Sequence, residues 1–548
     1  MYLDKITIQN FKRIKKRTTF DFSPITILVG PNSSGKSTLL EAINLTKILT
    51  EYVFEGSQSA SDYLNEISFN DILSSSAKTK KITFEALFKE YITSWEYSRE
   101  INDYGNDYYD FDDDYTPKII GWHNLSIKYI LRDSKGSISI DEIIINDNNI
   151  FDDNAASYWK NKPKNNSFII SLNYRKKIKQ QSYTKLPKNL IGSSEEWDKF
   201  LRVFEDYGYP KLGQTALFLP EDFHSYFYNV NFKRQGLDFN PIKEKIVENS
   251  LGILFAYDSP GNKDPLLDRK VFCNLFNENI NLVDELEYQE FKNILDLSED
   301  YFSKLCSSVD KALYYSEIDE TRKSPPELYE YHSGIVKNDF YGLMTFMLDS
   351  SNGSTKLQQK FFQKLKMFDI ADELKIQTIA EINKSRKFYK LLFYWKDNIF
   401  YHNKLSSGSK QIIPIILKLI RTPMQMREML ILGIRQPELH LHPKLQMKIA
   451  DILFERMNET HLNECYIVET HSEHMIKKFQ ILVANGDMSR EDLKIYYFDP
   501  VPNYLECNVV SLELNERGMF TKPWPNGFFE ESAVLNIQLI EAINNRKN

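Results

Sequence analysis

The residues best suited to chemistry form a glycine-rich run near the start of the chain, from Gly30 to Ser37, with the letters GPNSSGKS. The run fits the pattern G-x-x-x-x-G-K-[ST], whose glycines let backbone N–H groups converge on phosphate oxygens. Lys36 would place a positive charge beside the β- and γ-phosphates of a nucleotide, and Ser37 would offer its hydroxyl to Mg²⁺. The candidate nucleotide-binding residues of this loop are Asn32, Ser33, Ser34, Gly35, Lys36, Ser37 and Thr38.

The sequence around this run supplies the elements that a phosphate loop needs. Before it, residues 25–29 read Ile-Thr-Ile-Leu-Val, a run typical of a buried strand. After it, Leu39, Leu40, Ile43 and Ile48 recur at helical spacing, so a helix would direct its positive N-terminal end at the bound anion. A flexible serine–glycine turn is the alternative interpretation, and this strand–loop–helix context disfavours it.

A second glycine cluster, Leu405 to Gln411, precedes the apolar segment Ile412 to Ile420, which is expected to be a helix. By itself the cluster is explained by a serine–glycine turn that caps this helix. Beside a phosphate loop, however, it resembles the signature sequence of ABC-type ATPases. That resemblance implies that Ser406 and Gly408 reach across a dimer to the γ-phosphate held by the other subunit.

The most specific resemblance follows the apolar strand Met429 to Ile434, where the chain reads RQPELHLHP from Arg435 to Pro443. This block is similar to the Walker B segment and D-loop of AAA ATPases related to the OLD family, whose usual form is E-[EQ]-P-E-x-H-L-H-P. Further on, Glu469 to His474 (ETHSEH) resembles the T-H-S switch motif of the same ATPases. The resemblance covers about residues 1–50 and 395–535, the latter including a tail similar to a domain of unknown function.

This resemblance implies the catalytic candidates. Gln436 stands where the family polarises the attacking water, and His471 stands where it senses the γ-phosphate. Four histidines, His440, His442, His471 and His474, also raise the possibility of a zinc site. The family roles already account for His471 and for the turn that contains His440 and His442, so zinc is disfavoured.

One position departs from the family pattern, because Arg435 stands where an acid should hold Mg²⁺. A guanidinium is permanently charged and cannot ligate a cation. It either turns outward and pairs with an acid, or neutralises phosphate charge in place of part of the metal's role. With no carboxylate at 435 or 436, Glu438 is the nearest candidate base, and slow or absent hydrolysis is expected. Arg435→Glu should then accelerate hydrolysis.

Composition sets the remaining limits. The 548 residues require more than one compact unit, and 42% hydrophobic with 26% charged residues is ordinary for a soluble protein. The net charge of −7 argues against wholesale coating of nucleic acid, and four scattered cysteines without C-x-x-C spacing suit a reducing compartment. No stretch of 18 apolar residues is present, so we expect a cytoplasmic protein without a membrane span.

The fold expected is α/β, a split ABC-type P-loop ATPase head interrupted by a long, mainly helical insertion. We expect residues 1–190 to form the N-terminal part of the head, with the phosphate loop and a β-rich lobe. Residues 191–385 are expected to form the insertion, and residues 386–548 the C-terminal part. Strands are expected near 82–84, 125–131, 138–145 and 168–170, and helices near 195–206 and 356–366. The acidic, tyrosine-rich stretch 103–115 is expected to be a solvated loop.

The resemblance implies a homodimer that sandwiches two ATP molecules with Mg²⁺. Only about 75 residues follow Ser472, without a convincing carboxylate cluster, so a nuclease domain within the chain is not expected. A stand-alone ATPase of this type resembles the ATPase subunit of Septu-type antiphage systems, including the retron-associated ones, which works beside a separate HNH-type nuclease.

Other classes remain open. A DNA-repair or chromosome ATPase like RecF or the SMC proteins is the main alternative, although no sustained heptad appears in the insertion. The ATPase subunit of an ABC transporter is a third class, and the long insertion and the H-L-H-P block argue against it. DNA or RNA could bind two basic stretches, although a solvated charged face is the more frequent explanation of such runs. These stretches are Lys12, Arg13, Lys15, Lys16 and Arg17, and Arg175, Lys176, Lys177 and Lys179.

Overall fold

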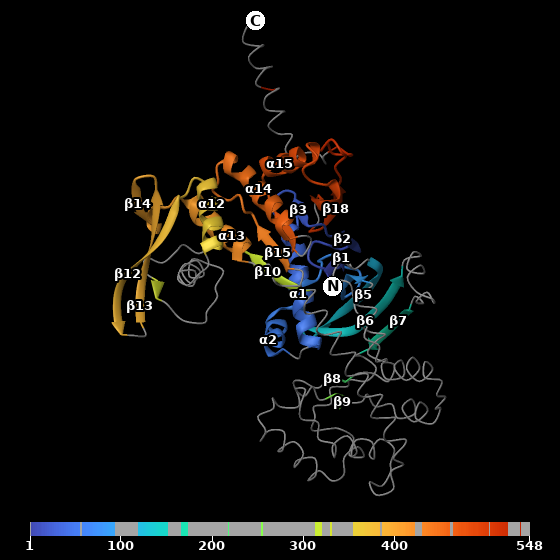
Figure 1. Ribbon diagram of the computed structural model, residues 1–548. Coiled ribbons are helices and arrows are strands. Elements are labelled where there is room, and N and C mark those ends of the chain that lie inside the picture. Colours follow the sequence, from blue (N-terminus) through green and yellow to red (C-terminus); the bar gives the residue numbers. More distant parts are fainter. Residues whose placement is uncertain are drawn as a thin grey trace, which may run out of the picture. The chain divides into compact units, whose positions relative to one another are not determined.

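The computed structural model of the chain describes residues 2–54, 57–93, 119–151, 166–173, 217–218, 254–255, 313–320, 329–330, 355–383, 386–421, 430–460, 464–502, 505–523 and 538. The chain divides into two compact units. Figure 1 labels the main helices and strands in the order of the sequence. Unit 1 comprises residues 1–20 and 42–313, and unit 2 comprises residues 21–41 and 314–548. Helix α1 (Lys36–Phe54) begins in unit 2 and continues into unit 1.

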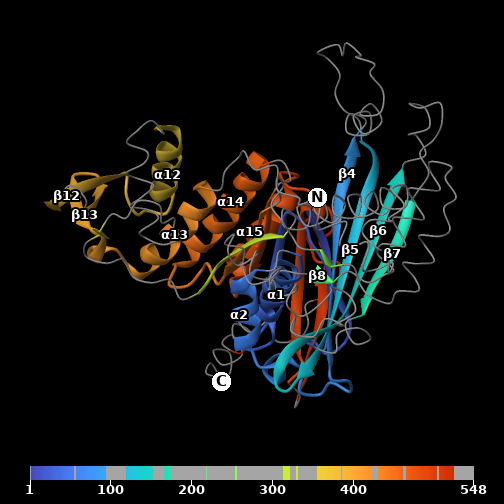
Figure 2. The ribbon, with the colours of Figure 1, turned by 90° about the horizontal axis from the view of Figure 1, so that it is seen from below.

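Unit 1 is built on a sheet with the strand order β2-β1-β4-β5-β6-β7, and Figure 2 shows β4 to β7 side by side. Its pairs from β1–β4 to β6–β7 are antiparallel. One face of β4 is buried at every second residue, at Ile82, Phe84, Ala86 and Phe88, as the two-residue period of a strand requires. The strands are β1 (Tyr2–Gln9), β2 (Thr18–Asp21), β4 (Lys81–Thr93), β5 (Ile119–Ser134), β6 (Ser137–Phe151) and β7 (Asn166–Asn173).

The strands expected from alternation in residues 80–180 are therefore confirmed within β4, β5, β6 and β7. The remaining described elements of unit 1 are short. They are α2 (Gln58–Glu66), α3 (Phe69–Ile72), β8 (Leu217–Phe218) and β9 (Leu254–Phe255). The expected acidic loop 103–115, the expected helix 195–206 and the basic stretch 175–179 lie outside the described residues.

Unit 2 contains the sheet that carries the phosphate loop, with the strand order β10-β15-β16-β3-β17-β18. All neighbours from β10 to β17 run parallel, and only β18 is antiparallel to β17. Since parallel strands end at the same edge, the residues that follow β3, β15 and β16 come together there. The strands are β3 (Ile25–Val29), β10 (Tyr314–Ile318), β15 (Leu430–Arg435), β16 (Glu464–Glu469), β17 (Leu493–Pro500) and β18 (Cys507–Leu512).

These strands bring together segments from the two ends of the chain. β3 comes from the first thirty residues, and both of its neighbours, β16 and β17, come from the last hundred. All residues of β3 and β16 are buried, which explains their continuous apolar sequences. The sheet packs into one core with helices α13 (Ser407–Arg421), α14 (Pro443–Thr460) and α15 (Glu473–Ala484). Short helical turns occur at η4 (His402–Lys404) and η5 (Arg490–Asp492).

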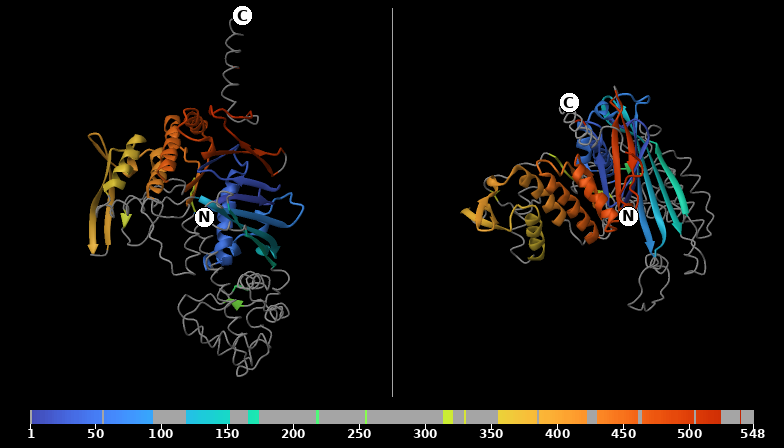
Figure 3. Two further views of the ribbon diagram at one scale, coloured as in Figure 1. Left: turned by 45° about the vertical axis from the view of Figure 1, so that its right-hand side comes forward. Right: turned by 90° about the horizontal axis from the view of Figure 1, so that it is seen from above.

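A second sheet of unit 2 lies beside helix α12 (Thr355–Met367), as both panels of Figure 3 show. It has the order β11-β13-β12, with β14 also pairing β13. Its strands are β11 (Tyr329–Glu330), β12 (Glu373–Asn383), β13 (Arg386–Trp395) and β14 (Asn398–Tyr401). The helix expected at 356–366 is confirmed as α12.

Five described strands, β8 to β12, fall within residues 191–385, where a mainly helical insertion is expected. β12 forms an antiparallel hairpin with β13, and β10 is the edge strand of the phosphate-loop sheet. Residues 314–318 therefore contribute to the head. Most of 191–385 lies outside the described residues, so the helical insertion and the proposed domain boundaries stay predictions. No described helix is both long and apolar enough to span a bilayer.

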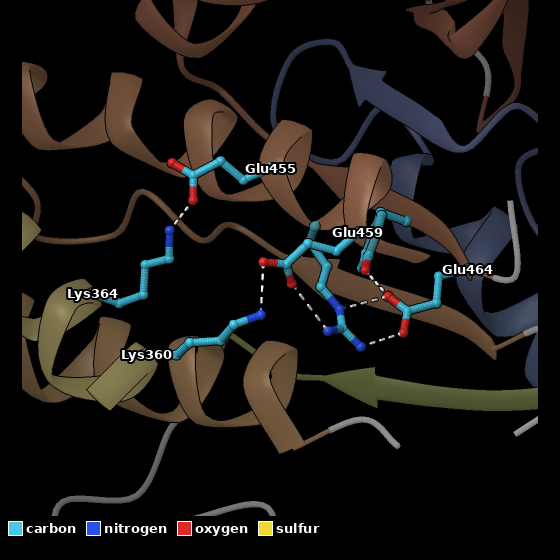
Figure 4. A network of polar contacts seen from close by, with 7 residues as sticks. Lys360, Lys364, Glu455, Glu459 and Glu464 are labelled. Atoms are coloured by element: carbon cyan, nitrogen blue, oxygen red, sulfur yellow. Dashed lines mark hydrogen bonds and ion pairs between the residues drawn. The ribbon is translucent and has the colours of Figure 1, made fainter. Parts of the chain in front are cut away.

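Charged side chains tie α12 and β16 to helix α14 (Figure 4). Arg456 of α14 donates to both carboxylate oxygens of Glu464, at 3.0 and 2.7 Å, and the Tyr466 hydroxyl donates to the same carboxylate. The side chains of Arg456 and Glu464 are only 6% and 5% exposed, so protein groups replace water around both charges, and Arg456 also lies 3.5 Å from Glu459. Nearer the surface, Lys360 of α12 pairs with Glu459 at 2.9 Å.

Candidate nucleotide site

The phosphate loop is shaped by residues in the left-handed region of backbone space. Gly30 has φ +146°, Ser33 +59° and Gly35 +108°, and α1 begins directly afterwards at Lys36. A Cβ at position 30 would lie 2.6 Å from the carbonyl oxygen of Phe498 and 2.8 Å from Ser34 Oγ. Both the backbone angle and the available space therefore require glycine at position 30.

The interior of the loop carries donors suited to an anion. Lys36 is only 3% exposed, and its Nζ donates to the carbonyl oxygens of Gly30 at 3.0 Å and Pro31 at 2.8 Å. Burial lowers the pKa of Lys36, an effect that the nearby Glu469 and Glu438 oppose. Ser34 is fully buried, and its Oγ has no hydrogen-bond partner among the described residues. A cradle that a Cβ would fill, with a buried lysine and an unpaired buried hydroxyl, fits a phosphate group.

The other loop candidates differ in exposure. Asn32 and Ser33 are exposed, whereas Thr38 is buried and its backbone N–H donates to the Gly35 carbonyl at 3.0 Å. Ser37 is partly buried, and its hydroxyl donates to an oxygen of Glu469 at 2.8 Å. The structure therefore brings a carboxylate to the residue that was expected to meet Mg²⁺.

Glu469 is the site residue that the motif comparison did not single out. It is the last residue of β16 and is 4% exposed. Burial raises the pKa of its carboxyl, while the Ser37 hydroxyl, Lys36 and Arg435 oppose that rise. The available signal was an acid directly after the apolar run 465–468 of a buried strand, since buried acids occur mainly where they have partners.

Arg435, the departure from the family pattern, ends the neighbouring strand β15. Its guanidinium forms an ion pair with Glu317 of β10, and the two side chains are 19% and 22% exposed. Burial opposes the charge, but Glu317, Glu41 and Glu469 outweigh it and raise the pKa of Arg435. Of the two alternatives left open by the sequence, the structure contains the pairing with an acid, and that acid is Glu317 on the neighbouring strand β10. Neutralisation of phosphate charge by Arg435 stays a prediction.

The catalytic candidates lie at the same edge of the sheet. Gln436 has φ +42°, and its backbone N–H donates to the carbonyl oxygen of Glu469 at 2.8 Å. Glu438 is 9% exposed and accepts a 2.6 Å hydrogen bond from the backbone N–H of His471. Burial, with a smaller effect of Lys36, lowers the pKa of His471 to about 4, so its imidazole is neutral near pH 7.

His471, the expected switch histidine, directly precedes a capped helix. The Ser472 hydroxyl accepts from the Met475 backbone N–H at 3.1 Å, which caps α15. The same hydroxyl donates to Gln446 at 2.6 Å, and the Gln446 amide donates to the Leu441 carbonyl at 3.0 Å. These bonds connect the turn after β15 to the turn after β16, so Glu438 and His471 sit on mutually supported backbone.

The second glycine cluster begins helix α13. The exposed Ser406 accepts from the Ser409 backbone N–H at 3.1 Å, which is the capping interaction expected from its sequence. A Cβ on Gly408 would lie 2.6 Å from the His440 carbonyl oxygen, so this glycine lets α13 approach the turn after β15. A contact of Ser406 or Gly408 with phosphate in another subunit stays a prediction.

The described residues contain no group of three or more His, Cys, Asp and Glu side chains arranged to hold a metal ion. A cation at Ser37 and Glu469 would therefore complete its shell with phosphate oxygens and water. That is the usual arrangement for Mg²⁺, which binds through one or two carboxylates together with substrate phosphates.

A buried parallel strand, a phosphate loop and a helix, with polar residues at the ends of neighbouring strands, define a P-loop nucleotide-binding fold. The chain belongs to the AAA ATPase domain family, whose model matches residues 1–476. The expected α/β fold, a P-loop ATPase head assembled from both ends of the chain, is confirmed, and its assignment to the ABC type stays a prediction.

Three individual proteins are similar to the chain, one over a short segment and two at low sequence identity. The chain is 52% identical over 44 residues to the DNA replication and repair protein RecF of Lactobacillus acidophilus, a match that spans 8% of this chain and 12% of that protein. The Smc head domain of Pyrococcus furiosus, solved with an extended coiled coil bound to the C-terminal domain of ScpA, is 13% identical with a TM-score of 0.34, over 98% and 99% of the two chains. The SMC head domain from Thermotoga maritima is 11% identical with a TM-score of 0.34, over 94% and 100%.

Proposed function

We propose that the chain is an ATP-binding, dimeric ATPase-type subunit whose nucleotide state regulates a separate nuclease in bacterial antiphage defence. The observation that carries the nucleotide function is the cradle from Gly30 to Ser37, with the buried Lys36 ammonium and the unpaired Ser34 hydroxyl inside it. Family membership over residues 1–476 supports the same function.

The loop residues divide the task of holding ATP. Lys36 exchanges its bonds to the Gly30 and Pro31 carbonyls for phosphate oxygens, while Ser34 and the loop N–H groups donate to the same anion. Mg²⁺, bound beside Ser37, would neutralise the charge that develops on the phosphates. His471 is placed near Lys36 to donate one hydrogen bond without adding charge, because its low pKa keeps it neutral.

Slow turnover follows from the residues at the end of β15. Neither Arg435 nor Gln436 can accept a proton from water, and Arg435 is paired with Glu317. Glu438 is the remaining candidate base, with one oxygen accepting the His471 backbone N–H. Bound ATP therefore acts as a clamp that holds two subunits together and is hydrolysed only slowly.

The defence function and the nuclease partner rest on the motif resemblance alone, that is, on the RQPELHLHP block and the ETHSEH segment. A separate HNH-type nuclease is the proposed partner. Co-expression of the chain with a candidate nuclease, followed by nuclease assays with and without ATP, tests this part. Nuclease activity that ignores the nucleotide would reject it.

The first experiment measures the nucleotide content and turnover of the purified chain, with labelled ATP and with or without Mg²⁺. We expect retained ATP and a turnover below about 1 s⁻¹, the low end of ordinary enzymes. Lys36→Ala is the control and should retain no nucleotide. Fast, Mg²⁺-dependent hydrolysis would reject the clamp, and absence of nucleotide binding by the wild type would reject the nucleotide function itself.

A DNA-repair ATPase is the second candidate, favoured by the short match to RecF. This function predicts that duplex DNA stimulates hydrolysis and that binding weakens steeply with salt. The basic stretch 12–17 forms the turn between β1 and β2, where Arg17 pairs with Glu85 at 2.8 Å. A flat response of binding to salt would remove this stretch as a nucleic-acid contact.

A further inference from the structure

The order of strands places Glu469 closer to the phosphate loop than position 435. Strand β16 lies between β15 and β3, and the loop follows β3 directly. Arg435 and Glu469 are paired positions on β15 and β16, and Glu469 is paired in turn with Leu28. The acid is therefore one strand, about 4.8 Å, nearer to the loop than the arginine beside it.

The contacts of Glu469 point it at the loop. Its carboxylate accepts the Ser37 hydroxyl at 2.8 Å, and this hydroxyl belongs to the residue whose type and place suit Mg²⁺. Glu469 is 4% exposed, and the main charges that act on it are Lys36 and Arg435. A buried carboxylate that accepts a hydrogen bond from a serine hydroxyl is only partly compensated for its lost hydration, and a divalent cation would complete the compensation.

The contacts of Arg435 hold its side chain on the side of β15 that faces away from β16 and Glu469. Its partner Glu317 is on β10, which flanks β15 on the side away from β16. The Tyr315 hydroxyl fixes that carboxylate by donating to it at 2.7 Å. Position 433 must stay small for this arrangement, because a Cβ on Gly433 would lie 2.7 Å from the Tyr315 hydroxyl.

We propose that Glu469, on β16, supplies the carboxylate ligand of a divalent cation bound with the nucleotide, and that Ser37 supplies the hydroxyl ligand. The family pattern places an acid at the position of Arg435, and in this chain an acid stands one strand nearer to the loop. This inference rests on the proposed nucleotide function. Phosphate oxygens and water complete the shell, as Mg²⁺ prefers. Arg435, held by Glu317, balances the negative charge of this edge instead of blocking the metal.

The test uses Mn²⁺ as the probe, because its electron paramagnetic resonance signal reports binding without turnover. The full chain is titrated with Mn²⁺ in the presence of a non-hydrolysable ATP analogue, and the affinity for the analogue is measured separately in EDTA. We expect Glu469→Gln to weaken Mn²⁺ binding by about 10–100-fold, at least the loss typical of outer-shell partners of metal sites. Its metal-free affinity for the analogue should be equal to or tighter than that of the wild type.

Glu473→Gln is the matched control, since Glu473 is also an acid of the ETHSEH segment but pairs with Lys477 on α15. It should leave Mn²⁺ affinity unchanged. Unchanged Mn²⁺ affinity in Glu469→Gln overturns the inference and leaves the nucleotide function standing. A wild type that binds no analogue, either in EDTA or with Mn²⁺, rejects the nucleotide function, and the metal site with it.

A second measurement covers the case in which Glu469→Gln does not fold. Wild-type protein labelled with ¹³C-glutamate should show a ¹³C hyperfine coupling to bound Mn²⁺ in electron–nuclear double resonance. The coupling should persist in Glu438→Gln, the other nearby acid of the site. A spectrum without the coupling in the wild type, or its loss in Glu438→Gln, overturns the assignment to Glu469.

Discussion

Single residues of the phosphate loop are fixed by space as much as by chemistry. Gly30 combines a φ of +146° with contacts that leave no room for a side chain, against the Phe498 carbonyl on one side and Ser34 on the other. The Phe498 carbonyl belongs to β17, so it cannot move without disturbing the sheet. The sequence motif identifies this glycine, and the structure gives the physical reason for it.

We predict that Gly30→Ala weakens ATP binding more than tenfold, which corresponds to more than about 1.4 kcal/mol. The methyl group would push the loop away from Phe498 and turn the N–H groups from the phosphates. Isothermal titration in EDTA with ATP measures the loss. Gly136→Ala is the control, because Gly136 also has a positive φ, of +93°, but a Cβ there meets nothing within 4 Å. Equal losses from both variants would mean that only folding is affected.

Arg435 shows how a structure changes the meaning of a substitution. From the sequence, Arg435→Glu is expected to restore a missing acid and accelerate hydrolysis. In the structure this change also removes the partner of Glu317 and adds an acid to an edge that already holds Glu41 and Glu469. Like charges in a buried site destabilise the fold. A faster or slower Arg435→Glu variant is therefore interpretable only beside its measured stability.

At the scale of elements, the sequence predicted what depends on local pattern. The buried run of β3, the helices α12 and α13 and the strands β15 and β16 are found where periodicity placed them. Strand order is a different matter, because it depends on contacts between distant segments. Nothing near residue 316 indicates that β10 joins β15, and nothing near residue 469 indicates that Glu469 meets Ser37, 432 residues away in the chain.

The same limit applies to the site. Motif resemblance located the phosphate loop, the switch histidine and Glu438, because each motif is contiguous in sequence. It assigned no role to Glu469, the acid before the T-H-S motif, and it indicated that Arg435 weakens the metal site. Only the adjacency of β15 and β16 shows that an acid still stands at this edge of the sheet.

Helix α14 provides a prediction at this scale, since it holds both a buried and a surface charge pair (Figure 4). Arg456→Met should lower the free energy of unfolding by about 3–5 kcal/mol, because it leaves Glu464 buried without its cation. Lys364→Met, which removes the surface partner of Glu455, should cost about 1 kcal/mol or less. Urea denaturation followed by circular dichroism measures both. A cost for Arg456→Met as small as that for Lys364→Met would mean that water reaches Glu464.

At the scale of the whole molecule, the head depends on both ends of the chain. β3 and the phosphate loop come from its beginning, and β15, β16 and β17 come from its end, so no part of the site can form before the C-terminal segments are present. A clamp that responds to nucleotide therefore needs the complete head. In the proposed dimer, the segment at Ser406, which caps α13, would be the second place at which nucleotide from another copy is recognised.

We predict that ATP, or a non-hydrolysable analogue, converts the chain to a dimer and that Ser406→Arg prevents this conversion. Ser406 is exposed at the start of α13, so a long charged side chain there would obstruct a facing subunit without touching the phosphate loop of its own. Light scattering during size-exclusion chromatography, with and without the analogue, measures the mass. Ser489→Arg is the matched control, because Ser489 is another exposed capping serine, and both changes should cost about 1 kcal/mol from the lost cap. Ser406→Arg should keep its affinity for the analogue as a monomer, whereas Ser489→Arg should still dimerise. A Ser406→Arg variant that dimerises normally would exclude α13 from the interface.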